Sequence, residues 1–330
     1  EQAYIHNRLP MGTQVSQQIL SHCIQKTLHS CAAFAISYSD NVIVFSKTPE
    51  EHIEHLERTI GALKTHGWKM SANKSHIMTT EDIIIFGFKL SLKTGTLEPD
   101  PDRVIKIRQM ESPKDIRAIR RFLGTLMYYT DMIPNIGSQL ATLQELLKTT
   151  KEYKWTETHQ KAFEDIKEAL ASPNFVILPD FSKDFHVVTD AGPTFVAGGV
   201  FQYAEEMEGL RPVAIWYKKL SAVEQRYSQI EREALALVGI LKCHAHILLY
   251  GYSIIHTDAR ALTFLKCFEA SPKLQRWRLF IDSFPHSIKW SSKNKPLSMF
   301  ADMLSRQEIK HHEKGKPKKE TLEKFAGPQL

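Results

Sequence analysis

Four acidic residues in the second half of the chain occupy positions from which carboxylates could do chemistry. Asp190 and Asp258 each follow an apolar, β-branched run directly. Glu233 stands near the start of a long helical pattern, and Asp302 lies in a last helical turn. An acid at the carboxyl end of a strand, beside helix starts, faces the crevice where α/β sheets place their sites. We therefore expect these acids to form one site, with separate surface carboxylates as the alternative.

Converging carboxylates repel one another unless a cation lies between them. Hard oxygen ligands with open coordination positions suit Mg²⁺, with Mn²⁺ as the alternative, because such ions keep waters and bind substrate phosphates. Two of these ions about 3.5–4 Å apart can activate a water and stabilise the leaving oxygen when a phosphodiester is cleaved. The four acids therefore predict metal-assisted phosphodiester hydrolysis.

The elements that must position these acids alternate between strands and helices. Strands are predicted at 185–189, 196–203, 211–217, 253–257 and 287–290, and helices at 224–250, 260–268, 272–283 and 300–306. This alternation is typical of an α/β domain of about 120 residues.

The first half of the chain shows other elements. A helical pattern at 13–28 precedes two short strands around the turn Ser39-Asp40-Asn41, which indicates a hairpin. Thr48, Pro49 and Glu51 predict the start of the next helix. Further on we expect one strand at 83–90 and helices at 115–129, 140–147 and 155–170.

Length and composition restrict the class of protein. The 330 residues are 42% hydrophobic and 24% charged, which fits two or three globular domains and excludes collagen-like, coiled-coil and wholly disordered chains. The net charge of +6 permits a polyanionic partner. No apolar run approaches the roughly 18 residues of a membrane span, so we expect no membrane partner.

The cysteines and the start of the chain suggest where the protein works. The four cysteines form no CxxC pair, which favours an intracellular, reducing compartment; they are Cys23, Cys31, Cys243 and Cys267. The sequence begins at Glu1 without methionine or signal peptide, so we expect a fragment or a processed product.

Short sequences around the four acids carry a family resemblance. They are Thr189-Asp190-Ala191, Tyr227-Ser228 with Glu231-Arg232-Glu233-Ala234-Leu235-Ala236, His256-Thr257-Asp258 and Phe300-Ala301-Asp302-Met303-Leu304-Ser305-Arg306. Together they resemble the ribonuclease H domain of gypsy-type LTR retrotransposons. The resemblance implies that Asp190, Glu233, Asp258 and Asp302 are the catalytic, metal-binding acids and that they hydrolyse the RNA strand of an RNA–DNA hybrid. Glu233 matches the family's spacing better than Glu231, whereas Gly192-Pro193 departs from the usual turn.

The upstream half is similar to the reverse transcriptase of the same polyprotein. Its matching motifs are Arg8-Leu9-Pro10-Met11-Gly12, Tyr38-Ser39-Asp40-Asn41, Phe122-Leu123-Gly124, Tyr128-Tyr129, Ile133-Pro134-Asn135, and Trp155-Thr156-Glu157 with Pro179-Asp180-Phe181-Ser182-Lys183 in the joining segment. The likeness covers residues 4–306 in unbroken order.

The polymerase motif departs from the family pattern. Asn41 replaces the second acid of the turn, and the sequence lacks the upstream strand with the third acid and the fingers. A neutral ligand weakens ion binding, so we regard Tyr38, Asp40 and Asn41 as a remnant and expect no DNA synthesis by this chain. A plain hairpin turn is the alternative interpretation of Asp40-Asn41.

Several basic residues are candidates for nucleic-acid binding. Arg117, Arg120 and Arg121 are spaced to share one helical face, where they could follow a phosphate backbone. Lys273 and Arg276 beside Trp277 are further candidates, and a solvated surface is the alternative for all five. His244 and His246 point in different directions from one helix, which argues against a zinc site.

We predict the α/β fold class: an α+β palm remnant, a helical thumb and a ribonuclease H-like α/β domain with a mixed sheet. The expected boundaries are a palm without fingers at 1–100, a thumb at 101–150, a connection at 151–183, the ribonuclease H-like domain at 184–307 and a charged, disordered tail at 308–330.

Three interpretations of the function stay open. The chain is a ribonuclease H that acts on RNA–DNA hybrids, or it is an inert nucleic-acid-binding or structural subunit. The inert subunit would pair with another polymerase subunit or with a second copy of this chain. The third interpretation is that the complete protein has a fingers domain that this sequence lacks.

Overall fold

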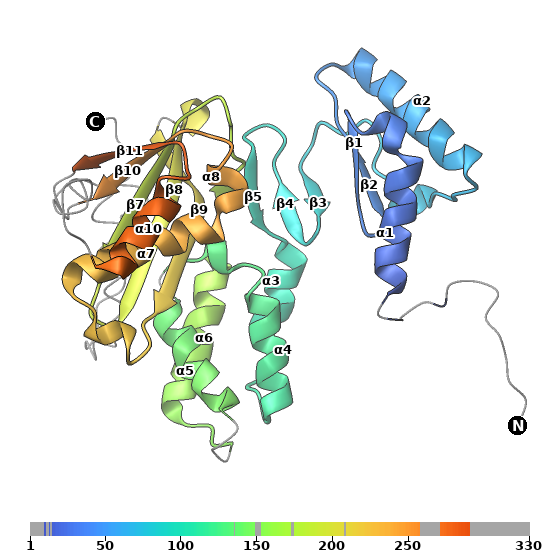
Figure 1. Ribbon diagram of the computed structural model, residues 1–330. Coiled ribbons are helices and arrows are strands. Elements are labelled where there is room, and N and C mark those ends of the chain that lie inside the picture. The colour runs from blue at the N-terminus through green and yellow to red at the C-terminus, as the bar shows by residue number, and fades with distance from the viewer. Residues whose placement is uncertain are drawn as a thin grey trace, which may run out of the picture. The chain divides into compact units, whose positions relative to one another are not determined.

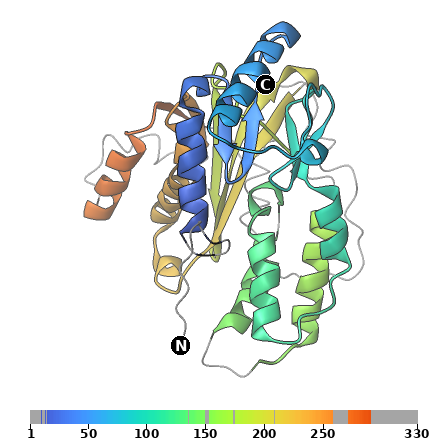
Figure 2. The same cartoon turned by 90° about the vertical axis from the view of Figure 1, so that its right-hand side faces the viewer.

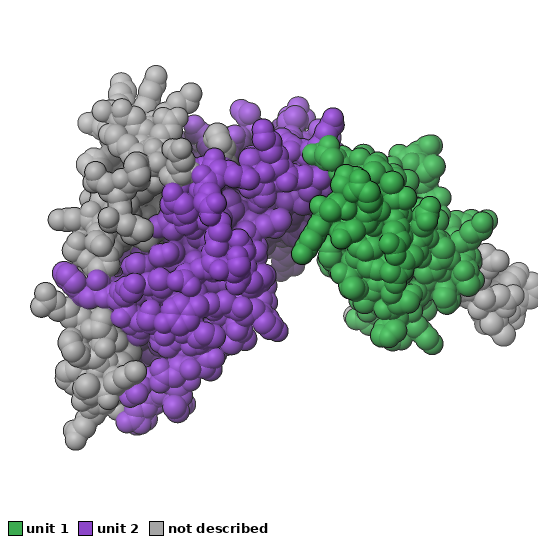
Figure 3. All heavy atoms as spheres, turned by 90° about the horizontal axis from the view of Figure 1, so that it is seen from above, with its two compact units in different colours: residues 1–80 green, residues 81–330 purple. Residues whose placement is uncertain are grey.

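The computed structural model describes residues 10, 13, 15–134, 136–148, 153–172, 175–207, 209–257 and 271–290. The chain forms two compact units, residues 1–80 and 81–330, which Figure 3 colours separately. The strands of the segment 83–99 belong to the second unit, although the sequence groups them with the first hairpin. The five domain ranges given above stay predictions.

The described part of the first unit forms a hairpin and two helices. Its elements are α1 (Ser16–Thr27), β1 (Ala35–Tyr38), β2 (Asn41–Val44) and α2 (Pro49–Thr65), with 3-10 turns at His29–Cys31 and Ala72–Lys74. The strands are antiparallel, as the turn residues predict. The Thr48 hydroxyl accepts the Glu51 N–H at 3.2 Å, so the predicted start of α2 is confirmed. Gly67, at φ 76°, follows the end of this helix.

The second unit begins with an antiparallel sheet of four short strands. These are β3 (Ile83–Ile85), β4 (Phe88–Leu90), β5 (Thr96–Pro99) and β6 (Val176–Ile177). The single strand expected at 83–90 is wrong, because Phe86 and Gly87 turn the chain with φ values of 52° and 82°. Such positive φ angles at both central residues are typical of a type I′ hairpin turn.

Four helices form an apolar layer next to this sheet, visible side by side in Figure 2. They are α3 (Pro101–Arg108), α4 (Ile116–Leu126), α5 (Gly137–Gln144) and α6 (Glu157–Ala171). Asp115 caps α4 by accepting the Ala118 N–H at 2.6 Å. The helices share a core that includes Ile119, Phe122 and Phe163. Helices α4, α5 and α6 agree with the predicted helices to within a few residues at each end, whereas no separate helix was predicted at the position of α3.

A five-stranded mixed sheet carries the candidate acids. Its strands are β7 (Phe185–Ala191), β8 (Phe195–Ala204), β9 (Gly209–Lys219), β10 (Ser253–Thr257) and β11 (His286–Trp290), in the order β11-β10-β7-β8-β9. β7, β10 and β11 are parallel, whereas β8 is antiparallel to β7 and β9 is antiparallel to β8. The predicted mixed sheet is therefore confirmed.

Helices α7 (Gln229–Cys243) and α10 (Pro272–Ile281) pack together and lie in front of this sheet in Figure 1. Leu237, Ile240 and Leu241 of α7 belong to the same buried core as Phe185 and Val187 of β7. Apolar burial of these side chains therefore fixes α7 across the central strand.

The continuous helix expected at 224–250 is wrong in its length. A 3-10 turn at Glu224–Arg226 precedes α7, and α8 (Ala245–Leu248) follows it. Tyr227 is extended, and Ser228 starts α7 with a capping box made with Glu231. The apolar residues keep helical spacing through this break, and that spacing does not show where a helix begins with a cap. The helices expected at 260–268 and 300–306 lie outside the described residues.

Candidate active site

Asp190 lies near the carboxyl end of β7, in the middle of the sheet. Its neighbours are β8 on one side, where Ala197 is its partner in register, and β10 on the other. The residue is 8% exposed and is therefore buried although it is acidic. A carboxylate is costly to bury unless neighbouring groups compensate its charge.

Glu233 is even less accessible, at 2% exposure, and faces β7 from the second turn of α7. Gln229, one turn earlier on the same helix face, donates its amide N–H to the Glu233 Oε1 at 2.7 Å. The same amide nitrogen donates to the carbonyl of Ala191 at 3.2 Å. One side chain therefore connects the Glu233 carboxylate to the residue that follows Asp190, and the structure brings these two predicted acids to the same end of β7.

Glu231 has a different role on the same helix. Its Oε2 accepts the Ser228 N–H at 2.9 Å, and its Oε1 pairs with the Lys273 ammonium at 2.8 Å. The Lys273 hydrogen bond, followed by the Ser228 backbone N–H, lowers the pKa of the Glu231 carboxyl. Glu231 thus caps α7 and joins it to α10, which leaves Glu233 as the acid turned toward β7.

The other two predicted acids, Asp258 and Asp302, lie outside the described residues. The strand before Asp258 is described: β10 runs parallel to β7, with His256 in register with Val188. Within the described ranges, no group of three or more His, Cys, Asp or Glu side chains is close enough to hold a metal ion.

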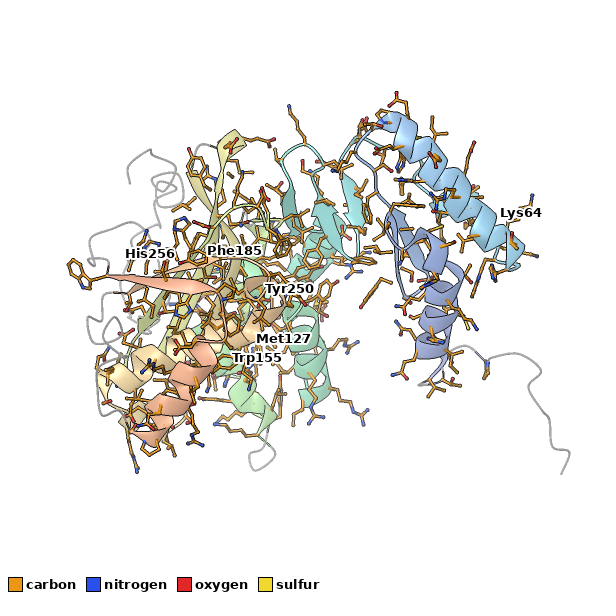
Figure 4. The ribbon with its side chains drawn as sticks, turned by 45° about the horizontal axis from the view of Figure 1, so that its top comes forward. Lys64, Met127, Trp155, Phe185, Tyr250 and His256 are labelled. Atoms are coloured by element: carbon orange, nitrogen blue, oxygen red, sulfur yellow. The ribbon has the colours of Figure 1, made fainter. Side chains whose placement is uncertain are left out.

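A histidine pair joins the same two strands, and the sequence gives no sign of it. His186 Nδ1 lies 3.0 Å from His256 Nε2, and the rings stack at a centroid distance of 5.3 Å. Figure 4 labels His256 on β10 and Phe185 at the start of β7. Burial lowers the pKa of His186. A neutral imidazole has one donor and one acceptor nitrogen, so one ring can donate to the other across the two strands.

The residues of the candidate polymerase motif lie in the exposed turn of the β1–β2 hairpin. Tyr38 and Asn41 are paired in register, and Ser39, at φ 56°, and Asp40 connect them. Tyr38 is 61% exposed, and Asp40 and Asn41 are also exposed. The turn therefore presents one carboxylate and one neutral amide to solvent.

The candidate phosphate-binding residues have different surroundings. Arg117, Arg120 and Arg121 are all exposed on the side of α4 that faces away from its buried residues. The structure records no ion pair for these three among the described side chains. Arg276 is exposed as well. Lys273 instead pairs with Glu231 and lies 3.4 Å from the centre of the Tyr227 ring.

Gln229 is a site residue that sequence reasoning missed. Its position four residues before Glu233, directly after the helix-capping Ser228, is a signal that could have found it, because residues at i and i+4 share a helix face. Its contact with Ala191 has no such signal, since that residue lies 38 positions away.

Two families of known proteins match separate parts of the chain. Residues 1–124 match the family described as reverse transcriptase (RNA-dependent DNA polymerase), and residues 155–256 match the RNase H-like domain found in reverse transcriptase. The Tf2-7 transposon polyprotein of Schizosaccharomyces pombe is 29% identical over 305 residues, and the Tf2-3 polyprotein is 30% identical. These matches cover 90% of this chain but only 22% of each polyprotein.

Solved structures with a similar fold are those of the foamy viral protease-reverse transcriptase. The complex with dsDNA has a TM-score of 0.73 at 19% identity and covers 87% of this chain and 60% of the viral one. The complex with an RNA/DNA hybrid has a TM-score of 0.72 at 20% identity and covers 88% and 40%. At these identities the likeness concerns the fold alone. From the family matches and the transposon relatives, the chain belongs to the gypsy-type retroelement polyproteins, with a reverse transcriptase part followed by a ribonuclease H-like part.

Proposed function

We propose that the second unit hydrolyses the RNA strand of RNA–DNA hybrids at a site formed by Asp190, Glu233, Asp258 and Asp302. The observation that carries the proposal is the placement of two buried carboxylates at one end of β7, connected through Gln229 and Ala191. Asp258 and Asp302 enter from their sequence positions, because Asp258 directly follows β10, the parallel neighbour of β7.

Divalent ions fit the donors of this site. Asp190 and Glu233 offer hard oxygen ligands at buried positions, which suits Mg²⁺ or Mn²⁺ held together with Asp258 and Asp302. When bound, such ions supply an activated water and neutralise charge on the cleaved phosphate. The protein's own contribution is to hold the Glu233 carboxylate in one orientation through Gln229 and to fix Asp190 in the central strand.

An RNA–DNA hybrid is the substrate we propose. The foamy viral protein of similar fold has been solved with an RNA/DNA hybrid, and this chain carries a net charge of +6. Exposed arginines on α4 could neutralise backbone phosphates. The chain spans about a fifth of the length of its transposon relatives, so the activities of the whole polyprotein are not assigned to it.

The test is cleavage of a labelled RNA–DNA hybrid in Mg²⁺ by the wild type and by Asp190→Asn. We expect the variant to lose more than about a hundredfold in rate, because even partners of metal ligands cost about 10–100-fold when removed. Asp184→Asn is a matched control, since Asp184 is an exposed acid just before the same strand. Equal cleavage by Asp190→Asn and wild type would refute the proposed site.

A second candidate function is an inert nucleic-acid-binding subunit, and Asn41 in the polymerase turn favours it. Replacing Arg117, Arg120 and Arg121 together by alanine tests whether α4 binds the nucleic-acid backbone. If the helix follows a phosphate backbone, hybrid affinity falls and log Kd depends less steeply on log salt, by about 0.7–0.9 per lost phosphate contact. Unchanged hybrid affinity and salt dependence would exclude α4 as a nucleic-acid-binding surface.

A further inference from the structure

Gln229 is held at three points around the candidate acids. Its amide nitrogen donates to the Glu233 Oε1 at 2.7 Å and to the Ala191 carbonyl at 3.2 Å. Its amide oxygen accepts from the Arg232 guanidinium at 2.7 Å. The amide therefore uses both its donor and its acceptor ends, and one chain of contacts runs from Arg232 through Gln229 to Glu233.

The orientation of this amide is determined by its neighbours. In the reversed orientation, the amide oxygen would face a carboxylate and a backbone carbonyl, and the NH₂ group would face the guanidinium donors of Arg232. All three contacts would then be repulsive, so the network admits one orientation. Because Arg232 polarises the amide toward Glu233, the N–H that reaches the carboxylate is a stronger donor than an isolated amide.

The network spans two elements that must stay in register. Gln229, Arg232 and Glu233 belong to α7, whereas Ala191 ends β7 directly after Asp190. Gln229 is itself exposed, although the carboxylate it contacts is on a residue only 2% exposed. Its amide therefore lies between solvent and the buried acid, without being part of the apolar core.

We propose that Gln229 is the positioning residue of the site: it fixes the Glu233 carboxylate and sets the distance between α7 and the Asp190 end of β7. This inference rests on the proposed hydrolase function for its effect on catalysis, but its effect on Glu233 does not depend on that function. Arg232 supports Gln229 by holding the amide oxygen. Partners that orient a metal ligand influence how tightly the ion binds, so the Mg²⁺ requirement should depend on Gln229.

The first experiment measures the Mg²⁺ concentration that gives half-maximal hybrid cleavage. Gln229→Met keeps a side chain of similar length but removes the donors, and we expect the requirement to rise about tenfold. The matched control is Gln225→Met, because Gln225 is also exposed and donates to a backbone carbonyl, that of Leu220 at 3.0 Å. A merely structural role would not raise the Mg²⁺ requirement, so an unchanged requirement in Gln229→Met overturns the inference.

The second experiment requires no activity. A double-mutant cycle with Gln229→Met and Glu233→Met measures how far the two side chains depend on each other in the urea unfolding equilibrium. We expect a coupling of about fivefold to tenfold in the unfolding equilibrium constant. The reason is that Gln229→Met removes a hydrogen bond to a charged group when Glu233 is present, but removes no such bond in the Glu233→Met background. Coupling below about twofold overturns the inference. Coupling without any wild-type cleavage would refute the proposed hydrolase and leave the positioning contact supported.

Discussion

The junction between α7 and α10 allows a prediction worked from its geometry. Lys273 pairs with Glu231 at 2.8 Å, with side-chain exposures of 29% and 19%. Its ammonium also lies 3.4 Å from the Tyr227 ring centre and 5.6 Å from that of Trp277. Lys273→Met keeps most of the apolar stem against these rings and removes the charge. The loss in the free energy of unfolding therefore measures the ion pair and the cation–π contacts.

The expected magnitude follows from the partial burial of the pair. A hydrogen bond between charged groups contributes about 1.5–3 kcal/mol, and solvent access favours the lower end. A cation–π contact adds about 0.5–1 kcal/mol. We therefore expect Lys273→Met to lower the free energy of unfolding by about 2 kcal/mol at neutral pH. For a unit of this size, that corresponds to a fall in Tm of about 4–8 °C.

The pH dependence of this loss has a definite sign. Lys273 holds the pKa of Glu231 below its ordinary value. A carboxyl with a lowered folded pKa stabilises the protein above its unfolded pKa of about 4.3, and that contribution disappears as the pH falls through the folded value. The difference between wild type and Lys273→Met should therefore be largest near pH 7 and shrink below about pH 4.

The assay is urea unfolding of four proteins at pH 7 and pH 3: the wild type, Lys273→Met, Glu231→Gln and the double variant. Glutamine at position 231 keeps the capping geometry and loses the charge. A coupling energy below about 0.3 kcal/mol at pH 7, or a loss that grows on acidification, would refute the reasoning.

Two further predictions each come with an internal control. Two neighbouring tyrosines donate to the turn of the β3–β4 hairpin. The Tyr129 hydroxyl donates to the Gly87 carbonyl at 2.9 Å, and the Tyr128 hydroxyl donates to the Phe86 carbonyl at 2.7 Å. Tyr129 is 0% exposed, whereas Tyr128 is 47% exposed. Calorimetry should therefore show Tyr129→Phe costing about 1–2 kcal/mol and Tyr128→Phe below about 0.5 kcal/mol; equal costs would contradict the burial argument. Gly239 lies on α7 where an added Cβ would overlap the Trp216 ring, whereas nothing lies within 4 Å of the corresponding position at Gly124 on α4. Alanine gains about 1 kcal/mol of helix propensity at both sites, but overpacking costs about 1–3 kcal/mol, so Gly124→Ala should raise Tm and Gly239→Ala should lower it.

Local signals predicted many of the elements that carry the candidate site. The start of α2 at Thr48 and the strands β7 and β10 follow from capping chemistry and from β-branched, apolar runs, which act over a few neighbouring residues. The prediction of Glu233 over Glu231 came from family spacing, and the contacts of Glu231 with Ser228 and Lys273 give that choice a physical reason.

Elements that depend on distant partners were not predictable in the same way. The two-residue strand β6 exists because Val176 and Ile177 pair with β5, about 80 positions earlier in the chain. The break before α7 and the turn at Phe86 also contradict the local pattern, since an apolar run gives no sign of a reversal.

The sequence by itself determined which residues could do chemistry, because residue type and spacing along one strand or helix are local properties. It identified the candidate acids, and it placed Asp190 at the end of a strand and Glu233 near the start of a helix. Only the tertiary structure decided that Glu233 and the Asp190 end of β7 share the amide of Gln229, because that contact joins a helix to a strand 38 residues away. Sheet order and the apolar packing of α7 on β7 bring them together, and neither can be read from spacing along the chain.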